Sequence, residues 1–107
     1  MDAAELERLM ALLRVPSISA SPDHADDMHR AAVMVADEVR RAAGSAEVVM
    51  TSGHPLVVGE VPASDGVPDG PVVVIYGHYD VQPPGDLALW TSPPFAPEVR
   101  GGNLYAR

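Results

Sequence analysis

The sequence contains no cysteine among its 107 residues, and this absence removes two classes of site. Disulfide bonds and thiolate metal centres are excluded, so any metal ion must be bound by histidine and carboxylate side chains. Aromatic residues make up only 5% of the chain, so valine, alanine, leucine and methionine must supply most of the packing. The longest apolar run, Val72 to Tyr76, is far too short to cross a bilayer.

Basic residues are also scarce, because seven arginines and lysines stand against 15 aspartates and glutamates. The net charge is −8 and the pI is near 4.7. With so few cations to neutralise phosphates, the composition argues against nucleic-acid binding and against an anionic membrane surface. The start of the chain shows neither the basic nor the apolar segment of a signal peptide. These features are compatible with the cytoplasm, which is the location we expect.

The first part of the chain shows the apolar periodicity of two helices. The first is predicted over about residues 3–14, with Asp2 as its N-cap and Glu5 completing a capping box. The second is predicted over about residues 22–44, with alanine, valine and methionine recurring every three or four positions on one face. Gly44 is a natural residue to end this helix.

The periodicity changes after the second helix, and short extended segments follow. Residues 47–51 and 56–61 are predicted strands, separated by a turn at residues 52–55. Residues 62–71 form a polar loop with several prolines and glycines.

The rest of the chain begins with a continuous β-branched run, Val72–Tyr76, which predicts a strand buried on both faces of a central parallel sheet. Residues 81–97 hold five prolines and cannot form regular structure. A hairpin is predicted to follow, with strands at residues 97–100 and 103–106 and its turn at Gly101–Gly102. The order of elements is α/β in character.

Candidate metal chemistry lies in His78 and Asp80, which directly follow the predicted buried strand. Sites in open α/β sheets form at the carboxyl ends of strands, and positions 78 and 80 project to the same side of an extended backbone. An imidazole can bind zinc through one ring nitrogen while a carboxylate holds the other. Taken alone, a His-x-Asp triplet is weak evidence, because a loop histidine near a surface aspartate is the commoner occurrence.

The residues around this pair strongly resemble one enzyme family. Residues 74–84 read VIYGHYDVQPP, residues 89–95 read LWTSPPF, and PEVR and LY follow. They resemble the zinc metallopeptidase family that includes carnosinases, cytosolic nonspecific dipeptidases, aminoacylases and succinyl-diaminopimelate desuccinylase. Residues 13–19, LRVPSIS, are similar to the end of the family's first helix and its P-S-x-S turn. The similarity therefore covers essentially the whole chain.

The resemblance implies that His78 is the first ligand of one zinc ion and that Asp80, counted with the catalytic residues, supports this histidine. It implies two zinc ions per intact site and zinc-dependent hydrolysis of the amide bond in dipeptides or similar small substrates by metal-activated water. The motif His-Tyr-Asp-Val-Gln-Pro favours the dipeptidase and carnosinase branch of the family. An N-acyl amino acid deacylase or desuccinylase of the same family is the alternative.

The same resemblance implies that residues 1–107 are the N-terminal part of a three-layer catalytic domain, with two helices, mixed-sheet strands and a hairpin. The bridging aspartate, the general-base glutamate, the other ligands and the dimerisation domain of the family have no counterpart here. Ala106 and Gly101 also depart from the usual family residues. We therefore expect a fragment that is inactive alone, from a parent that forms a homodimer. A non-catalytic, truncated module with a protein-interaction role is the alternative of another class.

Other polar and aromatic residues have plainer interpretations. His54 is interpreted as a solvated turn histidine, and His24 and His29 as exposed, with His24 near the helix cap. Asp86 favours a turn role over a substrate contact. Trp90 and Phe95 are predicted to pin the proline-rich loop onto the core, with a substrate contact by Trp90 as the alternative.

Overall fold

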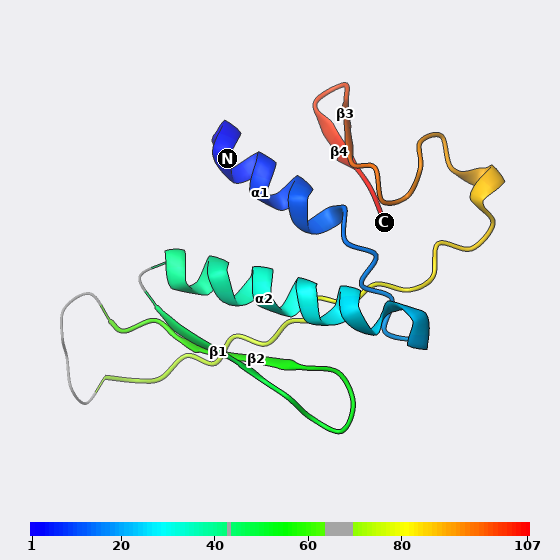
Figure 1. Ribbon diagram of the computed structural model, residues 1–107. Helices are drawn as coiled ribbons and strands as arrows, with labels where there is room; N and C mark the ends of the chain where they lie inside the picture. Colours follow the sequence, from blue (N-terminus) through cyan, green and yellow to red (C-terminus); the bar gives the residue numbers. More distant parts are fainter. Residues whose placement is uncertain (43, 64–69) are drawn as a thin grey trace.

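The computed structural model describes residues 1–42, 44–63 and 70–107 (Figure 1). Two helices come first and antiparallel strands follow, in the predicted order. Part of the predicted loop at 62–71 and the predicted helix-end residue Ala43 lie outside the described residues. The elements are α1 (Ala3–Leu13), η1 (Pro22–His24), α2 (Ala25–Arg41), β1 (Ser45–Val49), β2 (Leu56–Glu60), η2 (Leu87–Leu89), β3 (Glu98–Arg100) and β4 (Asn103–Tyr105).

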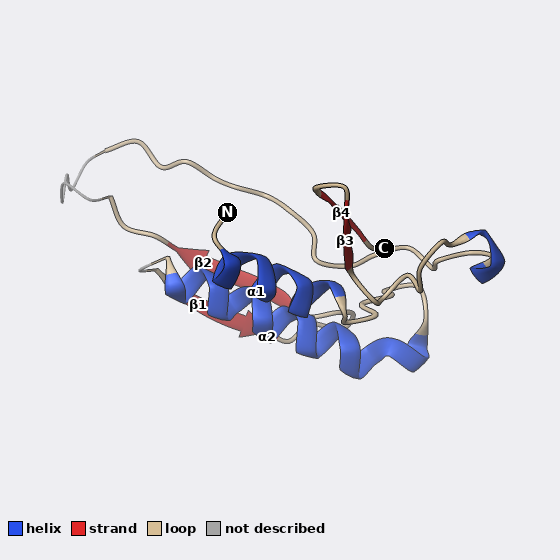
Figure 2. Cartoon of the chain, turned by 90° about the horizontal axis from the view of Figure 1, so that it is seen from above, coloured by secondary structure: helices blue, strands red, loops and turns tan. Residues whose placement is uncertain are grey.

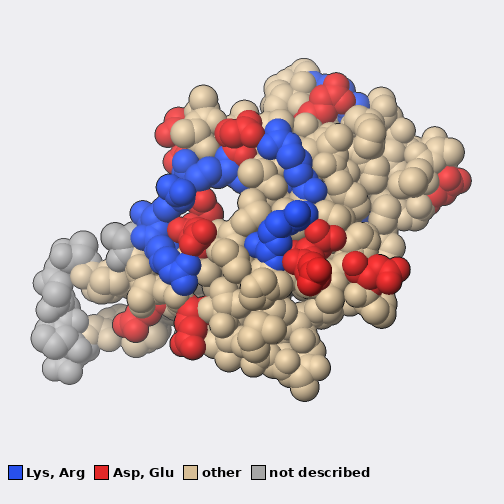
Figure 3. Space-filling model, in the orientation of Figure 1, with Lys and Arg blue, Asp and Glu red and all other residues tan. Residues whose placement is uncertain are grey.

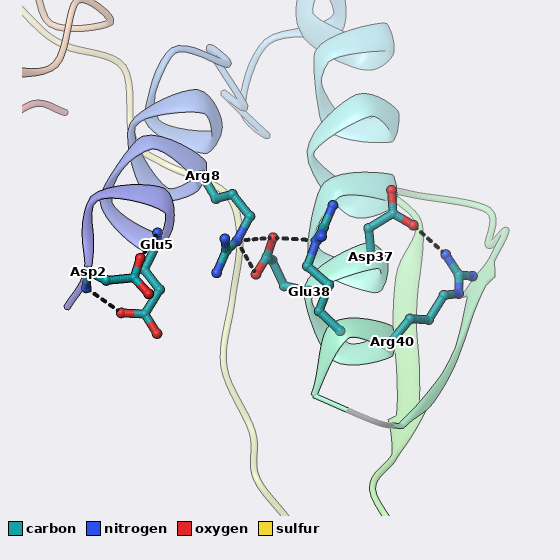
Figure 4. A network of polar contacts seen from close by, with 7 residues as sticks. Asp2, Glu5, Arg8, Asp37, Glu38 and Arg40 are labelled. Carbon is teal, nitrogen blue, oxygen red and sulfur yellow. Dashed lines mark hydrogen bonds and ion pairs between the residues drawn. The ribbon is translucent and has the colours of Figure 1, made fainter.

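Helix α1 begins with the predicted capping box. The Asp2 carboxylate accepts a hydrogen bond from the Glu5 backbone N–H at 2.8 Å, and the Asp2 N–H donates to the Glu5 carboxylate at 2.7 Å (Figure 4). Two backbone donors that a helix N-terminus would leave without partners are thereby satisfied. The helix ends at Leu13, before Pro16, as expected from the restriction that proline places on the residue before it.

Helix α2 supplies most of the core. It contacts both β1 and β2, and Figure 2 shows it lying along the hairpin that these two strands form. The residues buried on its apolar face are Met28, Ala31, Ala32 and Ala36. Three of these four are alanines, so the helix can approach the hairpin closely, and the interpretation of the stripe as core packing is confirmed.

Charged residues gather on the outside of the two helices (Figure 3). Arg8 of α1 reaches Glu38 of α2 at 3.1 Å, and Arg41 pairs with the same carboxylate at 3.4 Å. Figure 4 shows this contact beside the pair of Asp37 and Arg40. Helix α1 buries none of its residues fully, and of these pairs only Arg8–Glu38 joins it to α2, so this exposed ion pair holds the two helices together only weakly. Within the described part of the chain, no helix is long and apolar enough to cross a membrane.

Strands β1 and β2 form the predicted hairpin, with Val48 opposite Val57. Gly44 precedes β1, and its N–H donates to the Val39 carbonyl at 3.3 Å, close to the helix end that the sequence suggests. Close packing also explains this glycine. A Cβ atom at Gly44 would lie 2.6 Å from the Glu60 carbonyl oxygen and 2.9 Å from the Val61 side chain.

Substitution of Gly44 by alanine is therefore expected to destabilise the fold by about 1–3 kcal/mol, because the backbone of β2 must move to admit the new methyl group. The matched control is Gly53→Ala, whose Cβ would have its nearest neighbour at 3.8 Å. Urea denaturation followed by circular dichroism gives the free energy of unfolding of both variants. Equal stability of the two variants would contradict the packing argument.

The predicted buried strand at Val72–Tyr76 is wrong. These residues form no strand, and their exposed fractions run from 79% to 92%. A β-strand needs a hydrogen-bonded neighbour, and in the described chain β1 pairs only with β2 and β3 only with β4. The described residues thus contain no parallel sheet in which this run could be central. The radius of gyration, 16.2 Å, accordingly exceeds the value of about 13 Å for a compact domain of 100 residues.

The closing hairpin is confirmed. Strands β3 and β4 pair antiparallel, with Arg100 opposite Asn103. Gly101 and Gly102 have φ angles of 55° and 81°, the two consecutive positive values that a type I′ turn requires. Arg107 ties the end of this hairpin to the preceding loop, since its backbone N–H donates to the Pro94 carbonyl at 2.8 Å.

Candidate metal site

Two segments that are far apart in the sequence lie side by side next to His78, the candidate metal ligand. The segment between α1 and η1 runs beside residues 79–81, where Ile18 and Val81 form a parallel bridge. The Val81 N–H donates to the Ser17 carbonyl, and the Ser17 hydroxyl donates to the Tyr79 carbonyl, both at 2.9 Å. Ser17 and Ile18 are buried, so the crossing anchors the chain immediately after His78 in the interior.

The candidate pair, His78 and Asp80, lies at this crossing. The Nδ1 atom of His78 is 3.0 Å from Oδ1 of Asp80 and 3.0 Å from the Asp80 carbonyl oxygen. The imidazole is 75% exposed, whereas the carboxylate is only 28% exposed. The two side chains therefore project to the same side, as predicted from their spacing, although the segment before them is not a strand.

The contacts of His78 determine which of its nitrogens can bind a metal. Both partners of Nδ1 are oxygen acceptors, a carboxylate and a carbonyl, so Nδ1 carries the proton. In the neutral imidazole this leaves a lone pair on Nε2, on a ring that is largely open to solvent. This is the arrangement in which a carboxylate orients a ligating histidine.

The second carboxylate oxygen of Asp80 accepts a hydrogen bond from the Ser19 hydroxyl. This bond, aided by the contact with His78, holds the pKa of Asp80 below its ordinary value, while burial acts in the opposite direction. Asp80 is therefore ionised at neutral pH and can accept from both partners at once. The sequence analysis did not identify Ser19 as a site residue. The signal was its place in the P-S-x-S turn.

The interpretation of His54 as a solvated turn histidine is wrong. It is half-buried, and its Nε2 atom lies 2.8 Å from the Ser19 carbonyl oxygen. Because a carbonyl only accepts, Nε2 of His54 is the donor. The neighbouring Pro55 is buried, and its carbonyl accepts a hydrogen bond from the Tyr79 hydroxyl. Burial, together with the charge of Asp80, raises the pKa of Tyr79.

Two other histidines lie away from this site. His29 is exposed, as predicted, but His24 is half-buried and sits 2.7 Å from the Asp27 carboxylate. Asp86 caps η2 by accepting from the Ala88 N–H at 2.9 Å, which confirms its turn role.

Trp90 closes the proline-rich loop on itself, since its indole N–H donates to the Pro84 carbonyl of the same loop at 2.9 Å, and the predicted anchoring of this loop onto the core stays a prediction. It also lines a depression of about 240 Å³, together with residues that include Arg100 and Tyr105. The guanidinium of Arg100 lies 4.1 Å from the centre of the Tyr105 ring. A substrate contact by Trp90 stays a prediction.

The described residues supply only one of the ligands that a metal site needs. Among the described residues, no group of three histidine, aspartate or glutamate side chains is placed to hold an ion. Zinc sites in proteins use three or four protein ligands. His78, oriented by Asp80, can supply one such ligand, and the remaining ligands would have to come from elsewhere.

Comparison with known proteins defines the class to which this fold and pair belong. The chain is 38% identical, over 99% of its length, to the succinyl-diaminopimelate desuccinylase of Methylorubrum extorquens, of which it covers 26%. A stretch of 37 residues, 35% of the chain, is 62% identical to the desuccinylase of Methylococcus capsulatus and covers 10% of it. No protein-family model matches the chain.

A solved structure is also similar to this chain over its whole length. The crystal structure of an M20 family metallo-carboxypeptidase from Sulfolobus solfataricus superposes on the whole chain with a TM-score of 0.82 and 33% identity. The chain covers 23% of that structure. It therefore spans about a quarter of the length of the two proteins that it matches from end to end. These relatives are metallo-carboxypeptidase and desuccinylase hydrolases, and the α/β class of the fold is confirmed. Over its whole length the chain is thus similar to a desuccinylase and to a metallo-carboxypeptidase of the M20 family.

Proposed function

We propose that this chain is the N-terminal part of the catalytic domain of a metal-dependent amide hydrolase, and that His78 binds one of its metal ions through Nε2. The observation that carries the proposal is the His78–Asp80 pair, in which Nδ1 donates to the carboxylate and Nε2 is left on a ring that is open to solvent. The similarity of the whole chain to a desuccinylase and to a metallo-carboxypeptidase supports it.

Each residue of the pair has a distinct role in this proposal. His78 contributes a neutral imidazole, and Asp80 keeps the ring in one tautomer and one orientation by accepting from Nδ1. A metal ion, which we propose to be zinc, would polarise the scissile carbonyl and activate water when bound. Two ions per complete site, and ligands outside the described residues, are part of the same proposal.

Two substrate classes fit a hydrolase of this kind. The motif His-Tyr-Asp-Val-Gln-Pro favours a dipeptide, as in the dipeptidase branch. The names of the relatives favour an N-succinyl amino acid, because both sequence matches described above are desuccinylases. In either case the bond broken is an amide. We further propose that the complete enzyme is a homodimer and that it acts on small peptides or acyl amino acids in the cytoplasm.

The proposal is tested with the full-length protein that carries this chain. We expect it to hydrolyse either a dipeptide or N-succinyl-diaminopimelate, to lose this activity with a chelator, and to regain it with added zinc. Release of succinate identifies the desuccinylase, and release of two amino acids identifies the dipeptidase.

Absence of metal-dependent hydrolysis of both substrates by the folded protein would contradict the proposal. It would favour the interaction-module alternative, which requires a defined protein partner. The 107-residue chain alone is expected to be inactive on both substrates, because it supplies a single oriented ligand. Zinc-dependent turnover by that chain would show that further ligands are not needed.

A further inference from the structure

Three side chains form a continuous hydrogen-bonded series that ends at the candidate metal ligand. The Ser19 hydroxyl donates to Oδ2 of Asp80, and Oδ1 of the same carboxylate accepts from Nδ1 of His78. Ser19 lies 61 residues before Asp80 in the sequence, so only the fold brings them together. Both oxygens of the carboxylate are therefore engaged, one by the ligand and one by the serine.

We propose that Ser19 is a positioning residue for His78: it fixes the Asp80 carboxylate, and the carboxylate holds the imidazole with Nε2 directed outward. This inference rests on the proposed function only for its metal, because the orientation of His78 can be measured without one. Ser19 touches neither the ligand nor the ion in this scheme, and it acts entirely through Asp80.

Asp80 alone cannot hold an exposed ring so firmly. The terminal torsion of an aspartate is broad, so a carboxylate with one partner can rotate and release it. His78 is 75% exposed, and water competes for its Nδ1 proton. A second hydrogen bond, on the opposite oxygen, removes the rotational freedom of the carboxylate and lowers the entropy lost when His78 is oriented.

Ser19 is itself held in place by two neighbours. Its carbonyl accepts a hydrogen bond from Nε2 of His54 at 2.8 Å, from the turn between β1 and β2. The preceding residue, Ile18, is buried and forms the parallel bridge with Val81. The serine hydroxyl therefore projects from a backbone that is fixed on both sides, and His54 takes part in the same support from a third segment.

The alternative is a purely structural role, in which Ser19 only helps to hold the segment after α1 against residues 79–81. That role is already filled by the bonds of Ser17 to Tyr79 and Val81. The two interpretations differ in one observable. A structural serine has no effect on which nitrogen of His78 carries the proton, whereas a positioning serine does.

The test measures the tautomer of His78 in the metal-free 107-residue chain by long-range ¹H–¹⁵N NMR, at about pH 9, where an ordinary imidazole is neutral. We expect the wild-type chain to show mainly the form protonated on Nδ1. Ser19→Ala is expected to shift the population toward the form protonated on Nε2, and Ser19→Thr to restore it. Ser52→Ala, at an exposed turn residue, is the control.

A zinc titration followed on the His78 resonances supplies a second readout. Loss of the Ser19 hydroxyl is expected to weaken binding about tenfold, at the low end of the range for residues that support ligands, with recovery in Ser19→Thr. If the tautomer shifts but zinc never reaches His78 in the full-length wild-type protein, the proposed function fails and the positioning role stands.

Two results would overturn the inference. One is a His78 protonated mainly on Nε2 in the wild-type chain, a measurement that needs no variant. The other is an unchanged tautomer in Ser19→Ala when circular dichroism shows that the variant is folded. If Ser19→Ala does not fold, Ser19→Cys takes its place, because its thiol is a weak donor of nearly the same size. An unchanged tautomer in Ser19→Cys would count against the inference in the same way.

Discussion

Replacement of His78 by alanine is expected to abolish metal binding at this position and to lower kcat/KM of the full-length protein by roughly a thousandfold. The physical reason is that a bound ion contributes several kcal/mol of charge stabilisation in the transition state of amide hydrolysis. Among the described residues of this arrangement, His78 supplies the oriented nitrogen ligand, since Asp80 holds its ring and Ser19 holds Asp80.

The measurement combines metal analysis of the purified variant with the hydrolysis assay. The matched control is His29→Ala, because His29 is exposed on α2 and has no role in the site. We expect this control to retain both metal and activity. A His78→Ala protein that is folded, contains the full complement of metal and is fully active would refute the assignment of His78 as a ligand.

Substitution of Met28 by alanine is expected to destabilise the fold by about 2–5 kcal/mol. Met28 is only 2% exposed and is the largest fully buried side chain in the described part of the chain. The other core residues of α2 are alanines, which cannot expand to fill the space that a lost methionine leaves. The expected loss is a large part of the 5–15 kcal/mol that typically separates a folded domain from its unfolded state.

Chemical denaturation of the wild type and of two variants measures this effect. Met50→Ala is the matched control, because Met50 carries the same side chain at 65% exposure and is expected to change stability by less than about 0.5 kcal/mol. If both methionine variants unfolded at the same denaturant concentration, the burial of Met28 would not be the source of stability that we infer.

The sequence by itself determined the elements whose signals are local. The capping box joins Asp2 and Glu5, which lie three positions apart, and the apolar face of α2 repeats about once per turn. The pair Gly101–Gly102 determined the turn between β3 and β4, because few other residues adopt two consecutive positive φ angles. The placement of His78 and Asp80 on the same side of the chain is equally local, since the two residues lie two positions apart.

Tertiary structure alone decided the rest. Ser19 and His54 join the site across 61 and 35 residues, through a hydroxyl and a carbonyl whose partners no periodicity or local spacing predicts. It likewise decided the exposure of Val72–Tyr76, which the sequence analysis placed in a core. A β-branched run states a preference for extended backbone and apolar surroundings, but burial depends on a neighbouring strand. Whether such a strand is present depends on how the whole chain folds, because the backbone hydrogen bonds of a sheet join different segments.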